Sequence, residues 1–223
     1  MHLEGNSESV CGGGRIWKTC DDYNMKKIVV GMDEVGRGPL AGPVTVCVVS
    51  CNTDTYKKLK IYKKLPPLGK DSKKLKEQER ESYEKILKAL AKEGKISYSI
   101  NHIGNKIIDS KGLSFAIRKA IFLGIKKLKL SQNARVLLDG GLHAPKEFQN
   151  QKTLIKGDEK EKIIAWASVL AKVSRDKLMT QISKKYPKYG FHIHKGYGTE
   201  KHRKMIKKYG LTLIHRKSFI TSK

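Results

Sequence analysis

Short runs of β-branched and apolar residues alternate with longer helical patterns along the chain. The runs that predict strands lie at 26–32, 44–50, 95–100, 135–139 and 153–157. The helical patterns lie at 76–92, 111–128, 159–184 and 199–208. A short turn rich in glycine and proline joins the first two strands, which favours an antiparallel hairpin. The lysine-rich stretch 54–76 contains Pro66 and Pro67 and is predicted to be mostly loop.

The order of these elements predicts the fold class. Strands come first as a meander and then alternate with helices, which is typical of a mixed α/β sheet with helices on both faces. Residues 1–24 are glycine-rich and weakly patterned, so we expect a flexible or loosely packed extension there. Residues 25–223 are expected to form one domain, since a chain of 223 residues can bury a substantial core.

The charge balance narrows the class of partner. Lysine and arginine total 47 against 21 acidic residues, a net charge of +26. Such a surplus favours nucleic acid as the partner, because phosphate contacts release counterions. A solvated lysine surface without a partner is the alternative explanation, so charge alone does not indicate any chemistry.

The cysteines and the apolar runs bear on the cellular compartment. No Cys-x-x-Cys pair occurs, and Cys47 and Cys51 lie in an apolar run, which predicts buried thiols rather than zinc ligands or a disulfide. No apolar stretch is long enough to span a bilayer, and the N-terminus lacks a signal-peptide pattern. We therefore expect a cytoplasmic protein, a monomer without a membrane partner.

Four acidic residues stand beside apolar segments of this basic chain. Asp33 and Glu34 end the first predicted strand, Asp139 ends the strand at 135–139, and Asp176 lies inside the long predicted helix. Each one alone is best explained as a turn acid or the partner of a nearby lysine. Together they predict a site for two Mg²⁺ or Mn²⁺ ions, because clustered carboxylates repel one another unless cations lie between them. Such ions can activate water in phosphodiester hydrolysis.

The two adjacent acids impose a geometric condition. Neighbouring side chains in a regular strand point to opposite faces of the sheet. Asp33 and Glu34 are therefore expected to converge only if the chain leaves strand geometry between them, and Gly36 would permit such a break.

Four sequence blocks resemble the ribonuclease HII family, the bacterial type 2 ribonucleases H. They are GMDEVGRGPLAGPV at 31–44, DSKKL at 71–75, IIAWASVLAKVSRDKLM at 163–179, and FHIHKGYGTEKH at 191–202 followed by GLTLIHRKSF at 210–219. The blocks occur in the family's order and cover nearly all of 27–219. The type 3 branch is less similar, because its first motif does not read GRGPLAGPV.

The resemblance implies a fold, an activity and a metal site. The fold would be the ribonuclease H-like five-stranded mixed sheet flanked by helices, with a small helical C-terminal portion. The activity would be hydrolysis of the phosphodiester 5′ of ribonucleotides in RNA/DNA hybrids and at RNA–DNA junctions, leaving 3′-hydroxyl and 5′-phosphate ends. The cellular role would be removal of misincorporated ribonucleotides and RNA primers. The carboxylates implied to hold two Mg²⁺ or Mn²⁺ ions are Asp33, Glu34, Asp139 and Asp176.

The resemblance also implies which residues bind the substrate. The backbone of Gly36, Arg37 and Gly38 would contact the ribose 2′-hydroxyl, the group that distinguishes RNA from DNA. Tyr197 would stack near the sugar on the 3′ side and sense a DNA sugar there. The residues implied to bind phosphate are Ser72 and Lys73.

Two further features stand beside this resemblance. His192, His194 and His202 carry a weak zinc signal, and the resemblance implies structural or substrate-side roles for them instead. Trp166 occupies a position where the family usually has a small residue, so its ring must find space.

Three other functions are compatible with parts of the pattern. A basic RNA-binding protein without catalysis would explain the charge but not Asp139 and Asp176. Another nuclease or recombinase on the same fold would act on DNA alone. A catalytically inactive relative would bind hybrids without cutting them, although the presence of all four carboxylates argues against it.

Overall fold

The sheet is the frame of the molecule. The computed structural model describes residues 27–66 and 75–220. Five strands form one mixed sheet in the order β3-β2-β1-β4-β5. The strands are β1 (Ile28–Val35), β2 (Val44–Asn52), β3 (Ile96–Ile103), β4 (Arg135–Asp139) and β5 (Gln151–Leu154). β1 pairs antiparallel with β2 and parallel with β4, so both the predicted hairpin and the predicted mixed sheet are confirmed.

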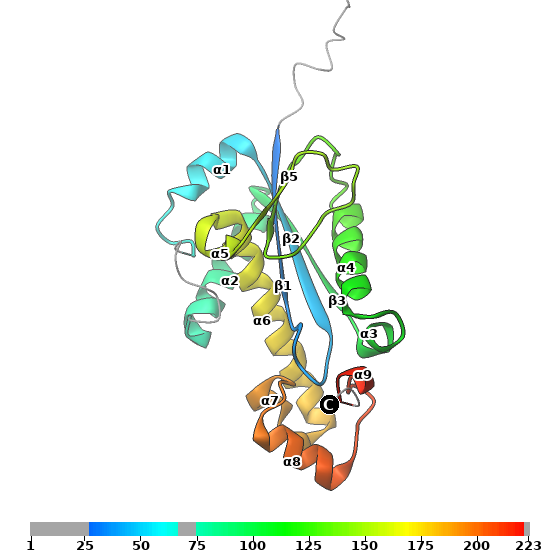
Figure 1. Ribbon diagram of the computed structural model, residues 1–223. Coiled ribbons are helices and arrows are strands. Elements are labelled where there is room, and N and C mark those ends of the chain that lie inside the picture. The colour runs from blue at the N-terminus through cyan, green and yellow to red at the C-terminus, as the bar shows by residue number, and fades with distance from the viewer. Residues whose placement is uncertain (1–26, 67–74, 221–223) are drawn as a thin grey trace, which may run out of the picture.

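Helices cover both faces of the sheet. Within the described residues they are α1 (Thr53–Lys60), α2 (Glu77–Lys92), α3 (Asn105–Lys111), α4 (Leu113–Lys127), α5 (Gly157–Lys160), α6 (Lys162–Lys185), α7 (Phe191–His194), α8 (Glu200–Tyr209) and α9 (Lys217–Ile220), with the 3₁₀ helix η2 (Pro187–Tyr189) before α7. Figure 1 shows α1, α2, α5 and α6 on one face and α3 and α4 on the other. The C-terminal helices α7, α8 and α9 gather at one end of the molecule. None of the described helices has the length and apolar character that crossing a membrane requires.

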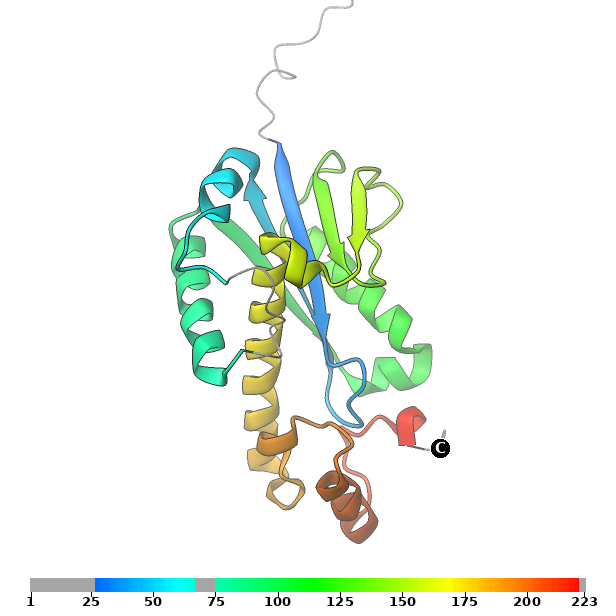
Figure 2. The ribbon, with the colours of Figure 1, turned by 60° about the vertical axis from the view of Figure 1, so that its left-hand side comes forward.

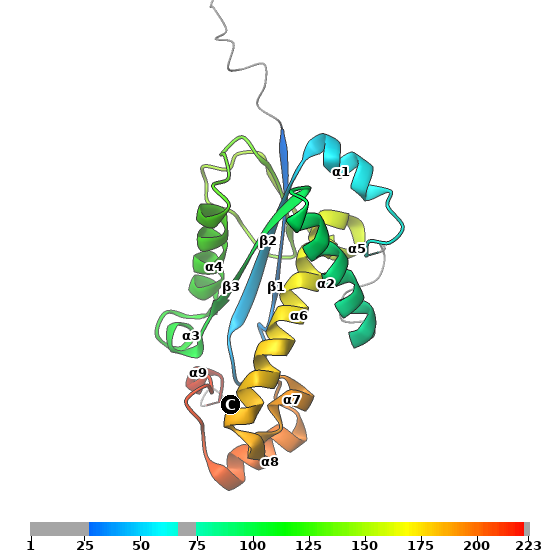
Figure 3. The same ribbon diagram turned by 180° about the vertical axis from the view of Figure 1, so that it is seen from behind.

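The alternation of side chains along the strands produces two hydrophobic cores. On one face Val49 and Leu137 pack with Leu170 of α6, and on the other Val48 and Val136 belong to the cluster that packs under α4. The long helix α6 lies along β1 in the view of Figure 2, and Figure 3, seen from behind the view of Figure 1, shows α4 and α6 on opposite sides of the sheet. Cys47 and Cys51 are buried free thiols, as predicted.

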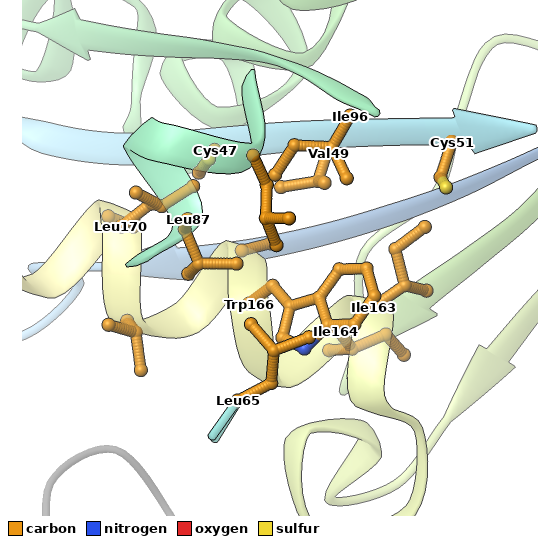
Figure 4. Packing of buried hydrophobic residues seen from close by; sticks show 14 of the residues in the cluster. Cys47, Val49, Cys51, Leu65, Leu87, Ile96, Ile163, Ile164, Trp166 and Leu170 are labelled. Carbon is orange, nitrogen blue, oxygen red and sulfur yellow. The ribbon is translucent and has the colours of Figure 1, made fainter. Parts of the chain in front are cut away.

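Trp166 fills the core beneath α1. Its side chain is fully buried, and its ring meets that of Tyr56 edge-on at 5.6 Å between centroids. Leu65 and Ile163 belong to the same cluster (Figure 4). The indole nitrogen has no hydrogen-bond partner among the described residues. The bulky ring therefore finds space in the core, at the cost of one buried polar group without a partner.

Three predicted boundaries were wrong. Residues 53–60 form α1 rather than loop, and the side chain of Asn52 caps this helix by accepting a hydrogen bond from the Asp54 amide. The helix predicted at 111–128 forms as α4 but begins at Leu113, because Gly112, with a φ of 82°, separates it from α3, which was not predicted. The helix predicted from 159 begins at Lys162, since the preceding residues form the separate turn α5.

A glycine sets the distance between α6 and the sheet. A Cβ added to Gly31 in β1 would lie 2.5 Å from the carbonyl oxygen of Ile163 in α6. Backbone atoms cannot move aside as a flexible side chain can, so any larger residue here would push α6 away from β1. The middle of β1 and the first turn of α6 are thereby held at a fixed separation.

We expect Gly31→Ala to lower the free energy of unfolding by about 1–3 kcal/mol or more, because it overpacks a helix–sheet contact. Gly141→Ala is the matched control, since an added Cβ there meets nothing within 4 Å. Urea unfolding followed by circular dichroism measures both changes. Equal stability of the two variants would contradict the close packing of α6 on β1.

Candidate metal centre and nucleic-acid site

Three carboxylates meet where the sheet opens at the carboxyl ends of β1 and β4. The parallel pairing of these strands ends at Met32 and Leu138. Asp33 and Asp139 are the next residues, and ligand oxygens of Asp33, Glu34 and Asp139 all lie within 4.8 Å of one another. Open α/β sheets generally bind their ligands outside the carboxyl ends of parallel strands, and this group occupies such a place.

The convergence of Asp33 and Glu34 does not require the break in the strand that we expected. Both remain in β1, paired with Cys47 and Val46 of β2. The neighbour on the other side, β4, no longer pairs with β1 at this point. The Glu34 amide then donates to Asp33 Oδ1 at 2.6 Å. A free strand edge, rather than a kink, allows both side chains to reach the same space.

The electrostatics of this group favour a bound cation. Burial, and next the charges of Glu34 and Asp139, hold the pKa of Asp33 well above its usual value. Burial also raises the pKa of Glu34, although Arg37, whose Nη1 lies 2.9 Å from Glu34 Oε1, opposes the shift. Glu34 Oε2 is buried and has no hydrogen-bond partner among the described residues. A divalent cation would both satisfy this oxygen and relieve the repulsion, so the residues fit such an ion.

Backbone and side-chain donors hold the other carboxylate atoms in place. Ser168 of α6 hydrogen-bonds the Asp33 side chain. The amide of Gly157, at the start of α5, donates to Asp139 Oδ1 at 2.6 Å. Asp33 and Asp139 are thus oriented by elements on the α6 side of the sheet.

Asp176 does not join this group. It lies two turns after Ser168 on α6, which displaces it by about 12 Å along the helix axis. Its oxygens lie 2.9 Å from Lys172 Nζ and 3.9 Å from Arg80 Nη2. Asp176 is therefore a buried ion-pair residue in this structure. The helical rise, which the sequence motif does not display, separates it from the other acids.

Sequence reasoning missed acidic residues that do line the site. A cavity of about 750 Å³ surrounds the carboxylates, and Asp158 and Glu159 of α5 line it with Asp33, Glu34 and Asp139. Asp158 is buried and directly follows Gly157, the residue that binds Asp139. The sequence could have identified Asp158 as a candidate site residue, because it directly follows the predicted strand 153–157. Asp139 was selected for a similar position at the end of its own strand.

The loop between β1 and β2, residues 36–43, is rich in glycine. This glycine-rich loop and Tyr197 border the same cavity. Gly36 has a φ of +89°, and a Cβ there would lie 2.3 Å from Arg175 Nε, so only glycine fits. A Cβ at Gly38 would meet nothing within 4 Å, which leaves its backbone open to a ligand. Tyr197 is 37% exposed, and the Arg175 guanidinium lies 5.8 Å from its ring centroid.

Positive side chains surround the acidic group. Besides Arg37, the cavity is lined by Arg80, Lys156 and Lys172. These four positive charges offset most of the five negative charges that line the cavity, which reduces the repulsion of an anionic polymer. Ser72 and Lys73, which we predicted to bind phosphate, lie outside the described residues, as does the predicted extension 1–24.

Comparison with known proteins gives a consistent result. Residues 30–222 match the family model described as ribonuclease HII. The chain is 44% identical over 200 residues to a ribonuclease HII of Clostridium beijerinckii, covering 89% of this chain and 70% of that protein. It is 43% identical to a ribonuclease HII of Endomicrobium trichonymphae, covering 86% and 84% of the two chains. The fold resembles the crystal structure of ribonuclease H2 from Pyrococcus horikoshii, with a TM-score of 0.64 at 24% identity over 86% of this chain and 93% of that one.

We expect Asp33→Asn to raise the thermal stability of the metal-free protein at pH 7–8 and to remove its stabilisation by Mn²⁺. Because the folded-state pKa of Asp33 is raised above its unfolded value, ionising this carboxyl opposes folding as pH rises from the unfolded-state pKa to the folded-state pKa and above. The gain should therefore shrink as pH falls through the folded-state pKa. For the unchanged protein, Mn²⁺ at a hundred times its dissociation constant should add about 2.7 kcal/mol.

Thermal unfolding with and without Mn²⁺ measures both effects. Asp54→Asn is the control, because Asp54 is an exposed acid on α1 with one surface ion pair to Lys57. If Mn²⁺ stabilised Asp33→Asn as strongly as the unchanged chain, Asp33 would not be a ligand.

Proposed function

The chain belongs to the ribonuclease HII family, and from this premise we propose that it hydrolyses the phosphodiester on the 5′ side of a ribonucleotide in duplex nucleic acid. Members of this family are metal-dependent endoribonucleases that act on RNA/DNA hybrids. The finer proposal covers hybrids and single ribonucleotides embedded in DNA, with 3′-hydroxyl and 5′-phosphate products. One observation carries it: the carboxylate group, the glycine-rich loop and Tyr197 border a single cavity.

Asp33, Glu34 and Asp139 are the proposed ligands of Mg²⁺ or Mn²⁺. Bound divalent cations supply Lewis acidity, which activates water and stabilises the leaving oxygen. We propose Asp158 as the fourth carboxylate in place of Asp176, because it lines the cavity next to the Gly157–Asp139 hydrogen bond. Asp176 already forms an ion pair with Lys172.

The loop after β1 is the proposed reader of the ribose. The open backbone around Gly38 supports close approach of the 2′-hydroxyl, which can both donate and accept a hydrogen bond. Tyr197, exposed at the cavity rim, has the flat apolar face that would stack on the following sugar. Together these contacts would select a ribonucleotide followed by DNA. Removal of misincorporated ribonucleotides and primers is the cellular role proposed for this activity.

The deciding experiment is cleavage of a DNA duplex that carries one ribonucleotide, with and without Mg²⁺ or Mn²⁺. We expect one cut on the 5′ side of the ribonucleotide, only when metal is present. An all-DNA duplex of the same sequence is the control and should stay intact. Cutting of the all-DNA duplex would favour a DNA nuclease on this fold, and binding without any cutting would indicate an inactive relative.

A pair of variants tests the fourth carboxylate. Asp158→Asn should lower the turnover on this substrate by a factor on the order of a hundred or more, as expected when electrostatic stabilisation of a transition state is lost. Asp176→Asn should reduce the turnover far less, because Asp176 does not line the cavity and forms ion pairs with Lys172 and Arg80. A larger loss in Asp176→Asn than in Asp158→Asn would restore the assignment implied by the sequence motif.

A further inference from the structure

Arg216, just before α9, is a fully buried arginine that binds the glycine-rich loop. It donates three hydrogen bonds to carbonyl oxygens of this loop: Nη2 to Gly36 at 2.7 Å, Nη1 to Arg37 at 2.8 Å and Nε to Gly42 at 2.9 Å. No carboxylate of the described chain forms an ion pair with it within 4.0 Å. Burial lowers the pKa of Arg216 to about 9. A buried charge held by carbonyl groups and by the ring of Phe219 is costly, so its placement calls for a reason beyond stability.

The reason lies in the direction of the loop amides. In a trans peptide the C=O and the following N–H point in opposite directions. Because Arg216 holds the carbonyls of Gly36 and Arg37, the amides of Arg37 and Gly38 point away from it. Residues 36–38 line the cavity, so these amides are presented on the side that a substrate would approach.

The preceding residue, His215, reaches Tyr197 through a second histidine. The Thr212 amide donates to His215 Nδ1 at 2.8 Å, so the neutral ring carries its proton on Nε2. His202 Nδ1 lies 2.9 Å from the Tyr197 carbonyl oxygen, which can only accept, so His202 carries its proton on Nδ1. The two Nε2 atoms are 3.0 Å apart, with His215 donating and His202 accepting. Every ring nitrogen of the pair therefore has one defined role.

The neutral state of this pair is consistent with its surroundings. Burial is the first cause that lowers the pKa of His202 and of His215, each to about 4. Both rings are thus uncharged at neutral pH, as the hydrogen-bond roles require. Protein groups engage all four ring nitrogens, which leaves no lone pair for a metal ion.

Main-chain bonds complete the connection between the two parts. The Arg216 amide donates to Leu40 O at 2.8 Å, and the Gly42 amide donates to Ile214 O at 2.9 Å. The Leu40 amide donates to Gly196 O at 2.8 Å, beside Tyr197. One short C-terminal segment therefore contacts the glycine-rich loop directly and connects to the backbone that carries Tyr197 through His202 and Leu40.

We propose that His215 and Arg216 are positioning residues that fix Tyr197 and the loop amides relative to one another, and so set the preference for a ribonucleotide followed by DNA. This inference rests on the proposed function. A single embedded ribonucleotide offers one register, in which both contacts must be made at once. A continuous RNA strand offers many registers and no DNA sugar for Tyr197, so a shift of Tyr197 costs less there.

The test compares kcat/KM on two duplexes: DNA with one ribonucleotide, and an RNA strand paired with DNA. His215→Phe keeps a planar ring but removes both nitrogens, and Arg216→Lys keeps the charge but not the guanidinium fork. Each should lower the ratio of the two values by a factor on the order of ten to a hundred, as misplacement of about 1 Å can do. The ratio does not depend on the fraction of folded protein, since an unfolded fraction lowers both values equally.

Matched variants separate positioning from general damage. Arg135→Lys changes an exposed arginine at the amino end of β4, outside the cavity, and should leave the ratio unchanged. His202→Asn keeps a side-chain N–H near the position of Nδ1 but loses the acceptor for His215, so it should lower the ratio as His215→Phe does, and His202→Leu should lower it further. In a Tyr197→Ala background, His215→Phe should have no further effect on the ratio.

Two results would overturn the inference while leaving the proposed function intact. One is a ratio unchanged from that of the original protein in both His215→Phe and Arg216→Lys. The other is an effect of His215→Phe that persists in full when Tyr197 is absent. Failure of the unchanged protein to cut either duplex with Mg²⁺ or Mn²⁺ would instead refute the proposed function itself.

Discussion

Repulsion between buried carboxylates is the constraint on which the arrangement of this molecule depends. Asp33, Glu34 and Asp139 place ligand oxygens within 4.8 Å of one another, and burial raises the pKa of Asp33 well above its usual value. Such a group opposes folding unless cations or donors offset its charge. The donors observed around it have this effect: Arg37 binds Glu34, and the Gly157 amide binds Asp139.

The sheet and α6 make this unfavourable group geometrically possible. Parallel pairing of β1 with β4 ends one residue before the acids, which frees the strand edge. The contact between Gly31 and Ile163 then fixes α6 against β1, so that Ser168 reaches Asp33. Rigid elements on both sides keep the carboxylates preorganised for cations, rather than leaving them to separate in response to their own repulsion.

A second set of buried charges holds the glycine-rich loop. Arg175 donates to Pro43 O and Arg216 to Gly36 O, so arginines from α6 and from the C-terminal segment hold the same loop. The loop therefore lies between fixed negative charges at its start and fixed positive charges beneath it. Substrate phosphate and divalent cations would meet at this boundary. The small C-terminal helical portion thus contributes to the site and is not merely an appendage.

The sequence by itself determined the sheet, its order of elements and the identity of the family. The runs 26–32 and 44–50 predict strands because they are short, apolar and rich in β-branched residues, and the strand formed by the second run is buried on both faces. Asp33, Glu34 and Asp139 could also be selected, since each ends a strand and strand ends meet at a sheet edge. The short helix α1 was missed, because its lysine-rich pattern buries only Tyr56 and Leu59.

Only the tertiary structure decided which further acid approaches the group. Asp176 and Asp158 both follow apolar segments in the sequence. A sequence motif gives the order of such residues but not how far along a helix axis each one lies. The rise of α6 carries Asp176 to Lys172 and Arg80, while the turn at Gly157 returns Asp158 to the cavity. The same holds for His215 and Arg216, whose partners lie far away in sequence. Contacts over such separations depend on the packing of whole elements, which local patterns do not encode.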